Sequence, residues 1–320
     1  MALRISQVAY RHTTDLDLTK TFKSKEWDRV GNVCVVRATN ALTKDIAGYT
    51  KEQRDHLGDM FNAMSATNRS IRRLLEPGFE DPSTVDALAL ARLQLECLYA
   101  LCLMFEDAQY VDHYTQDYWK KQYVSYLLAR EEVMALPRLL DFVSNTPVEL
   151  IQLGLHFGVT MAQIATVELQ ELGKPLPPGV SHQAIPKFPT PGGVIPLIPQ
   201  GDKRRMLERL HQKYVELCSF AHGLGRSNLL RIIFDSRSPH NKFASDADKE
   251  QKFQYEVTGE CYTMSFLSIA QATAELTLRY PGEVDLSVAA SDAWDQLRQV
   301  SFVPKAVWEL RTRALLGIIG

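Results

Sequence analysis

The stretch VDALALARLQLECLYALCLMFEDAQ, residues 85–109, decides the fold that the sequence predicts. Its apolar side chains cover nearly every face of a helix, whereas a surface helix carries them on one stripe. Its most apolar part has about the length of a membrane span. However, Arg92, Gln94 and Glu96 lie within that part, and a lipid-facing helix rarely tolerates such residues. We therefore expect a buried helix at the centre of a bundle.

Most other strong patterns in the chain have the three-and-four spacing of amphipathic helices. The clearest is Lys51–Glu76, which Pro77-Gly78 ends. Thr146, Pro147 and Glu149 form a helix start signal, with a capping side chain, a proline suited to the first turn and a capping-box acid. Further helices are predicted at residues 32–47, 114–134, 147–172, 202–222, 251–279, 286–300 and 305–318, with a short one ending at 143. A break at Gly158 is an alternative within 147–172.

The segment Gly173–Gln200 differs from the rest of the chain because it holds eight of the fifteen prolines. Proline lacks a backbone N–H, so this segment cannot form a helix or a central strand. It also carries apolar side chains, among them Ile185, Phe188, Val194, Ile195, Leu197 and Ile198. We therefore expect an ordered, polyproline-like strap across the surface of the bundle.

The predicted fold class is all-α, a multi-helix up-and-down bundle with this proline-rich strap. Only Val33–Val36 keeps a strand as a local alternative. The domain organisation has two parts. Residues 1–50 form an N-terminal arm and first helix, and residues 51–320 form a single helical bundle domain, which the proline-rich connection at 173–200 interrupts.

The composition argues against several classes of function. With a formal net charge of −2 over 320 residues, the chain has no basic field to hold duplex DNA. One stretch, Leu150–Leu172, is patterned like a helix-turn-helix, but its second helix carries only acids, Glu168 and Glu171. The N-terminus has no secretion signal, so we expect a cytoplasmic protein with no membrane partner.

The sequence indicates neither a metal nor a cofactor. The five cysteines include no CxxC pair and lie mostly in apolar helical runs, as buried reduced thiols do. A di-metal site in a helical bundle needs two Glu-x-x-His pairs, and only Glu208–His211 fits. The chain has no glycine-rich phosphate loop and no G-x-S-x-G nucleophile elbow.

Two polar constellations interrupt apolar helices. Arg92 and Glu96 are four residues apart, so they share one helix face, and buried charges there need partners. Tyr214, Cys218 and His222 follow one stripe of a later helix at a spacing of four, and His222 falls in its last turn. The structural interpretation is an ion pair that fixes helix register and a histidine that satisfies helix carbonyls. The functional interpretation is a polar pocket in the bundle core.

The combination of LARxxxE in an apolar helix with YxxL and HG at the end of a later helix resembles the HEPN-like helical proteins. The matching residues are Leu90, Ala91, Arg92, Glu96, Tyr214, Leu217, His222 and Gly223. More narrowly, residues 55–135 and 205–280 are similar to an uncharacterised bacterial branch related to abortive-infection and toxin proteins. The resemblance implies an up-and-down bundle. Some members of the wider group cut RNA as dimers, with an arginine and a histidine.

The sequence departs from that pattern at two places. Cys218 stands where these relatives often have serine, and Ser219 is displaced by one position. The arginine–histidine signature of the nucleases is met only by Arg204 or Arg205 with His211. That stretch is also typical of a solvated helix start.

Three functions are compatible with these residues. The favoured one is a cytosolic helical binding or regulatory protein, in a stress or defence system, without a cofactor. Its candidate site residues are Arg92, Glu96, Tyr214 and His222. The rival is a metal-independent HEPN-type ribonuclease, in which His222 is the general acid or base and Arg92 stabilises the phosphorane charge. The third is a structural or interaction protein with no catalytic site. An RNA or protein partner and a homodimer are compatible with the favoured function.

The cost of burying the two charges predicts where the candidate residues lie. We expect Arg92, Glu96 and His222 to converge in the bundle core, because a third polar group would help to satisfy the two charges there. In such a sealed site, Glu96→Ala would cost roughly 3–5 kcal/mol.

Overall fold

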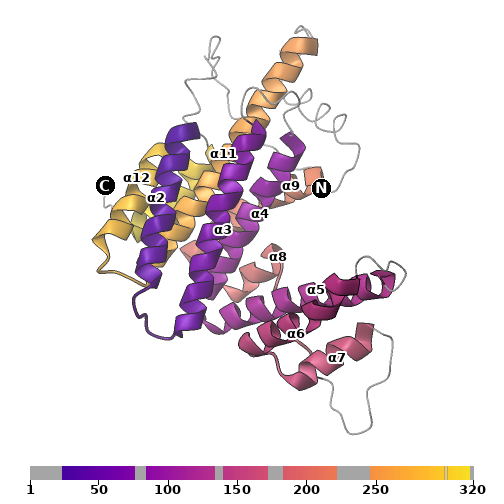
Figure 1. Cartoon of the computed structure of the whole chain (residues 1–320). Coiled ribbons are helices and arrows are strands. Elements are labelled where there is room, and N and C mark those ends of the chain that lie inside the picture. Colours follow the sequence, from indigo (N-terminus) through magenta and orange to yellow (C-terminus); the bar gives the residue numbers. More distant parts are fainter. Residues whose placement is uncertain are drawn as a thin grey trace, which may run out of the picture.

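The computed structural model describes residues 24–75, 84–133, 140–171, 183–221, 246–298, 300 and 302–317. These residues form helices and connecting turns with no strand, so the structure is an all-α, multi-helix bundle, as the sequence predicts. Long helices lie side by side in the main body, and a smaller group formed by α5, α6 and α7 projects from it (Figure 1).

The first described helix, α2 (Ser24–Leu42), begins and ends earlier than predicted. Trp27 is buried and stacks on Phe266 of α11 (Asp246–Thr277), with ring centroids 5.2 Å apart. One aromatic residue among polar ones gives little helical periodicity, so the sequence pattern predicts part of the arm here. The strand alternative at Val33–Val36 is wrong, because that stretch is helical. Residues 1–23 of the predicted arm lie outside the described part of the chain.

The centre of the bundle is α11 rather than α4 (Thr84–Met104). Every residue from Cys261 to Thr277 is buried, and α11 packs against α2, α3 (Lys51–Leu75), α4 and α12 (Val284–Leu297). The prediction that α4 is apolar and enclosed holds for its second half, whereas Leu93 in its first half is 41% exposed. Hydropathy favoured α4 because α11 carries many polar side chains that are bonded inside the bundle.

Polar contacts inside the core tie α3, α4 and α11 together. The Gln94 side-chain amide donates to the Met64 carbonyl at 2.7 Å and to the Ser265 hydroxyl at 3.1 Å. The Ser265 hydroxyl donates in turn to Asn68 Oδ1 at 2.7 Å. A shift of any of these helices would leave buried polar groups unsatisfied, so the contacts fix their register.

The helix α4 also meets the length and composition of a membrane span. Its stretch Asp86–Met104 is the one such segment in the part of the chain that the structure describes. Other helices bury 67% of its most apolar window, as they do for the core helix of a soluble protein. The burial agrees with the bundle helix that the sequence predicts.

The smaller group, the α5–α7 lobe, consists of α5 (Gln109–Val133), α6 (Leu140–His156) and α7 (Met161–Glu171) and has its own apolar cluster. Trp119 belongs to this cluster, and its indole N–H donates to the Leu150 carbonyl at 2.6 Å. The predicted break between a helix ending at 143 and one starting at 147 is wrong, because α6 continues through Pro147. Proline's fixed φ suits a helix, and the packing of Leu150 and Ile151 offsets the hydrogen bond that Pro147 cannot donate.

The proline-rich segment is ordered against the bundle at residues 183–200, and residues 172–182 lie outside the described part. In this described part, the side chains of Ile185, Val194, Ile195 and Ile198 are buried. The prediction of an unbroken non-helical strap is wrong at one place, where α8 (Pro191–Val194) and the 3₁₀ turn η2 (Ile195–Leu197) form. Pro191 stands at the first helical position, where its fixed φ suits a helix and no N–H is needed.

The last described elements form one helical run with a π-helical segment in its middle. They are α13 (Phe302–Val307), the π-helix η4 (Trp308–Thr312) and α14 (Arg313–Leu315). The sequence predicts a plain helix over residues 305–318, since a π turn leaves no mark in the apolar pattern. The η4 segment packs against α9 (Asp202–Ala221). Such π segments are frequent at functional sites.

Gly154 of α6 occupies a position where a side chain cannot fit. A Cβ atom there would lie 2.6 Å from Trp119 Cε2, and the indole is fully buried and bonded to α6. We expect Gly154→Ala to lower the free energy of unfolding by about 1–3 kcal/mol, the usual cost of overpacking. Urea unfolding followed by tryptophan fluorescence measures this change.

The matched control is Gly58→Ala on α3, because a Cβ there would meet only Thr39 Cγ2, at 4.0 Å. Alanine in this helix interior should stabilise the protein by roughly 0.5–1 kcal/mol. Equal effects at the two glycines would contradict the packing described for Trp119.

Candidate functional site

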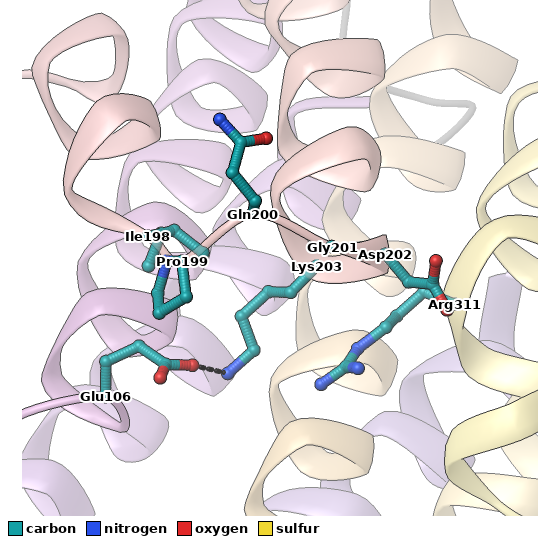
Figure 2. A pocket seen from close by; sticks show the side chains of 8 residues that line it. All are labelled: Glu106, Ile198, Pro199, Gln200, Gly201, Asp202, Lys203 and Arg311. Atoms are coloured by element: carbon teal, nitrogen blue, oxygen red, sulfur yellow. Dashed lines mark hydrogen bonds and ion pairs between the residues drawn. The ribbon is translucent and has the colours of Figure 1, made fainter.

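The helices α4 and α9 lie antiparallel, and polar side chains bridge them at both ends of their contact. Near one end, Tyr214 of α9 donates to Glu96 of α4. At the other end, Lys203 of α9 pairs with Glu106, which follows α4 (Figure 2). Between these ends, the Tyr99 hydroxyl donates to the Leu207 carbonyl at 2.5 Å. We call this contact the α4–α9 seam.

The first site on the seam, the Arg92 cluster, consists of Arg92, Glu96 and Tyr214. These are three of the four candidate residues from the sequence. Arg92 Nε lies 3.3 Å from Glu96 Oε1, and the Tyr214 hydroxyl donates to the same oxygen at 2.9 Å. The structure thus brings the charged pair of α4 to a tyrosine that is 118 residues away from Glu96 in the sequence. The fourth candidate, His222, lies outside the described residues.

The Arg92 cluster is not sealed in the bundle core, so the expected burial of its charges is wrong. The side chains of Arg92 and Glu96 are 26% and 29% exposed. They lie on the first half of α4, where Leu93 also faces solvent. Partial exposure lowers the cost of removing either charge, because water can solvate the partner that is left behind.

The phenol of Tyr214 is a fixed hydrogen-bond donor. Burial raises the pKa of Tyr214, and its hydrogen bonds with Cys218 and Glu96 raise it further, so the hydroxyl stays protonated at neutral pH. His211 stacks on the Tyr214 ring with 5.8 Å between centroids, and the Tyr99 ring lies 6.4 Å away. These contacts hold the phenol in place, and the phenol in turn orients the Glu96 carboxylate.

The second arginine–histidine combination from the sequence involves residues that are engaged elsewhere. Both arginines form ion pairs with acids of α9, Arg204 with Glu208 and Arg205 with Asp202. His211 packs under the α8 turn, where a Cβ on Gly192 would lie 3.4 Å from its Cε1. None of these contacts links either arginine to His211.

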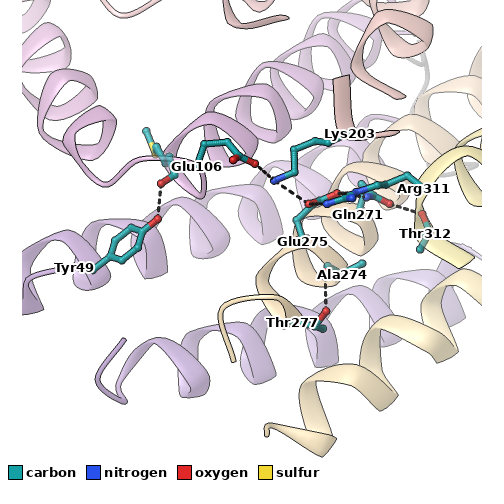
Figure 3. Close-up of polar contacts among 10 residues, drawn as sticks. Tyr49, Glu106, Lys203, Gln271, Ala274, Glu275, Thr277, Arg311 and Thr312 are labelled. Carbon is teal, nitrogen blue, oxygen red and sulfur yellow. Dashed lines mark hydrogen bonds and ion pairs between the residues drawn. The ribbon is translucent and has the colours of Figure 1, made fainter. Parts of the chain in front are cut away.

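The second site is a charge network around Glu275 of α11 (Figure 3). The Glu275 side chain is 0% exposed, and Arg311 of η4 donates to both of its carboxylate oxygens at 2.8 Å. Lys203 Nζ lies 3.1 Å from Glu275 Oε2 and also pairs with Glu106. We call Glu106, Lys203, Glu275 and Arg311 the Glu275 network. Its two negative and two positive formal charges cancel.

Uncharged side chains complete the surroundings of Glu275. Gln271 Nε2 donates to Glu275 Oε1 at 3.0 Å, and the Thr312 hydroxyl donates to Gln271 Oε1 at 2.7 Å. Burial alone would raise the pKa of Glu275, but the Arg311 hydrogen bonds and the Lys203 charge outweigh it and hold that pKa below its ordinary value. Burial likewise opposes the charge on Lys203, and the charge of Glu275 leads the contributions that raise the pKa of Lys203 overall.

A cavity of about 180 Å³ opens beside the Glu275 network. Three members of the network line it, and Figure 2 shows their side chains around the turn that enters α9. Ile198 and Pro199 form an apolar wall. The full lining is Glu106, Ile198, Pro199, Gln200, Gly201, Asp202, Lys203 and Arg311.

The sequence patterns described above do not predict this second site. Glu275 stands in the run AQATAELTL, residues 270–278, where a charge interrupts small and apolar residues just as Arg92 and Glu96 interrupt α4. That signal could have marked Glu275 as a buried charge. Its partners Lys203 and Arg311 come from other helices, and no spacing rule connects them to it.

The described part of the chain shows no cluster of metal-ligating side chains, and burial makes two of its thiols unreactive. No group of three or more His, Cys, Asp or Glu side chains among the described residues is arranged to hold a metal ion. The cysteines are free thiols. Burial raises the pKa of Cys34 and Cys97 to about 12, so both stay protonated at neutral pH and are poor nucleophiles.

Removal of the Glu96 and Glu275 carboxylates should have unequal effects on stability. Glu275→Ala leaves Lys203 and Arg311 without a buried partner, so we expect a loss of about 3–5 kcal/mol. Glu96→Ala removes one charged hydrogen bond at a partly exposed site, so we expect about 1–2 kcal/mol. Urea unfolding at neutral pH measures both losses. Equal values would show that the difference in burial has no energetic consequence.

The Glu275 network should also govern stability in acid. Because the folded-state pKa of Glu275 lies below its ordinary 4.5, this carboxylate stabilises the fold above that value. The contribution is lost as the pH falls through the folded-state pKa. We expect the difference in unfolding free energy between wild type and Glu275→Gln to be constant from about pH 5 to about pH 8 and to shrink in acid. Urea unfolding across a pH series tests this, and a difference that persists in acid would contradict it.

Comparison with known proteins provides no relative for the chain. No protein-family model, no curated protein and no solved structure matches it. The HEPN-like resemblance therefore stays a prediction from the residues quoted above, and the function has to be argued from the seam itself.

Proposed function

We propose that this protein is a helical binding or regulatory protein and that the Arg92 cluster is its recognition site. The proposal rests on the incomplete hydrogen bonding of the Arg92 guanidinium. Its Nε is buried without a hydrogen bond, and it pairs with a carboxylate that Tyr214 already holds. In the described part of the chain no residue bonds the terminal nitrogens of this guanidinium, whose side chain is 26% exposed.

An arginine in this state suits an anionic group on a partner molecule. Guanidinium groups bind phosphate and carboxylate through parallel N–H donors. Tyr214 fixes the Glu96 carboxylate, and Glu96 in turn orients Arg92. The ligand class that we propose is therefore a phosphate or carboxylate group presented by the partner.

The pKa values of polar side chains in the two sites favour recognition over proton transfer. General acid–base catalysis is most efficient when a group titrates near the working pH. For the reasons given above, the pKa values of Tyr214 and Lys203 are raised and that of Glu275 is lowered, so all three move away from neutrality. These side chains keep a single charge state at neutral pH, which is what a binding surface needs.

A ribonuclease is the second candidate, and the accessibility of Arg92 favours it. The guanidinium lies beside α9, whose last residue, Ala221, directly precedes His222 in the sequence. In this function His222 would act as the general acid or base, and Arg92 would stabilise the phosphorane charge. A purely structural protein is the third candidate, although a partly exposed ion pair contributes little to stability.

Wild-type protein and three variants, Arg92→Gln, Arg204→Gln and His222→Ala, separate these functions. Arg92→Gln removes the proposed anion contact. Arg204→Gln is the matched control, because Arg204 forms the same kind of pair with Glu208, at 3.2 Å and with 24% exposure of its own side chain. One probe is inorganic pyrophosphate, followed by the thermal midpoint. The other is a fluorescent single-stranded RNA incubated in EDTA.

We expect pyrophosphate to raise the thermal midpoint of the wild type and of Arg204→Gln. The apparent affinity should be about tenfold weaker for Arg92→Gln, the equivalent of one charged hydrogen bond. The RNA should stay intact. Cleavage in EDTA that is lost in both Arg92→Gln and His222→Ala would replace the proposal with the ribonuclease. If pyrophosphate leaves the thermal midpoint of the wild type and of every variant unchanged, the structural function would replace the proposal.

A further inference from the structure

We propose that the cavity beside the Glu275 network binds a small zwitterion, a molecule with one carboxylate and one ammonium group such as a free α-amino acid. This site lies at the opposite end of the α4–α9 seam from the Arg92 cluster. The inference does not depend on the function proposed for that cluster.

The cavity has a charged wall that packing alone does not require. Apolar side chains of similar size can often replace a buried ion network without loss of stability. Here the network instead faces a cavity of about 180 Å³, and Arg311 reaches it from the π-helical segment η4. A buried charge network, a cavity and a π segment therefore coincide at one place.

The donor side of the cavity is provided by Arg311. Its Nε and Nη2 both donate to Glu275. Its Nη1 has no partner among the described residues, although Arg311 lines the cavity. Asp202, the first residue of α9, lines the same cavity, and its own carboxylate pairs with Arg205. A carboxylate fits this side.

The acceptor side is provided by Glu106. Its Oε1 pairs with Lys203, and its Oε2 has no partner in the described part of the chain. The Glu106 side chain is 28% exposed and lines the same cavity as Arg311. Lys203 is already shared between Glu106 and Glu275. An ammonium group therefore fits against the free oxygen of Glu106.

Charge balance restricts the ligand further. The four charges of the Glu275 network cancel, and the Asp202 carboxylate in the lining is paired with Arg205, so a ligand with a net charge would leave one partly buried charge uncompensated. A zwitterion supplies one charge of each sign to the two unfilled positions and preserves the balance. A simple anion or a simple cation fills only one of them.

Size and shape agree with a short amino acid. The cavity of about 180 Å³ is more than ten times the roughly 10–15 Å³ that one water molecule needs, so a molecule of the size of alanine fits in it. Ile198 and Pro199 would face a short aliphatic side chain.

Calorimetric titration of the wild-type protein tests the proposal with ligands that divide the zwitterion into its parts. The probes are glycine, L-alanine and L-serine, with acetate as the carboxylate alone and ethylamine as the ammonium alone. We expect at least one amino acid to bind. Acetate and ethylamine should each bind more weakly by a factor of about ten or more, since each loses one charged contact. If none of the three amino acids binds at millimolar concentration, or if acetate or ethylamine binds equally well, the proposal is wrong.

A conservative variant assigns the binding to the cavity. Glu106→Gln keeps the side-chain size and removes the partner of the ammonium group, so amino-acid affinity should fall about tenfold. Acetate should bind no more weakly than to the wild type, because the variant leaves an extra positive charge at Lys203. Glu309→Gln is the matched control, because Glu309 is 55% exposed and pairs with Arg313 outside the cavity lining. Equal affinity in Glu106→Gln and wild type would overturn the assignment. Pyrophosphate and alanine report on different sites, so either proposal can fail alone.

Discussion

The bundle is organised around one carboxylate that water does not reach. An isolated charge at Glu275 would cost several kcal/mol, and its burial depends on Arg311 and Lys203. Arg311 comes from the π-helical segment near the C-terminus, and Lys203 comes from the first turn of α9. Segments that are distant in the sequence must therefore meet at one point when the central helix is buried. The positions of α9, of η4 and of the end of α4 follow from this requirement.

The same helix shows why part of the fold could be predicted from the sequence and part could not. Apolar periodicity predicts α3, α9, α11 and α12 within a few residues, because each has a long apolar stripe or run. It misassigns the centre, because α11 is polar at Ser268 and Thr273, and these hydroxyls donate to carbonyls within their own helix. Hydropathy counts such residues as exposed, and only the surrounding helices reveal that they are buried. The predicted break before Pro147 was wrong for a related reason. The local penalty of a proline is visible in the sequence, whereas the packing that offsets it is not.

The two sites differ in how far sequence reasoning could reach them. Arg92 and Glu96 interrupt an apolar run, and the rule that such charges need polar partners directed attention to the stripe of α9 that contains Tyr214. The expected burial was wrong, because no pattern shows which turns of α4 the other helices cover. The Glu275 network was out of reach for a different reason. Lys203 and Arg311 stand in ordinary charged stretches, KRR and ELRTR, and their meeting with Glu275 is a product of tertiary packing alone.

The seam gives α9 a role beyond carrying residues. The helix is held at its first turn by Lys203, in its middle by the hydroxyl of Tyr99 and near its other end by Tyr214. A packed helix shifts as a unit because close-packed side chains do not deform independently. A ligand that displaced Lys203 would have to break the Glu275 pairing, whereas one that fills only the free positions on Glu106 and Arg311 leaves α9 in place. We infer that the cavity accepts ligands of the second kind, and that their binding strengthens the anchor of α9.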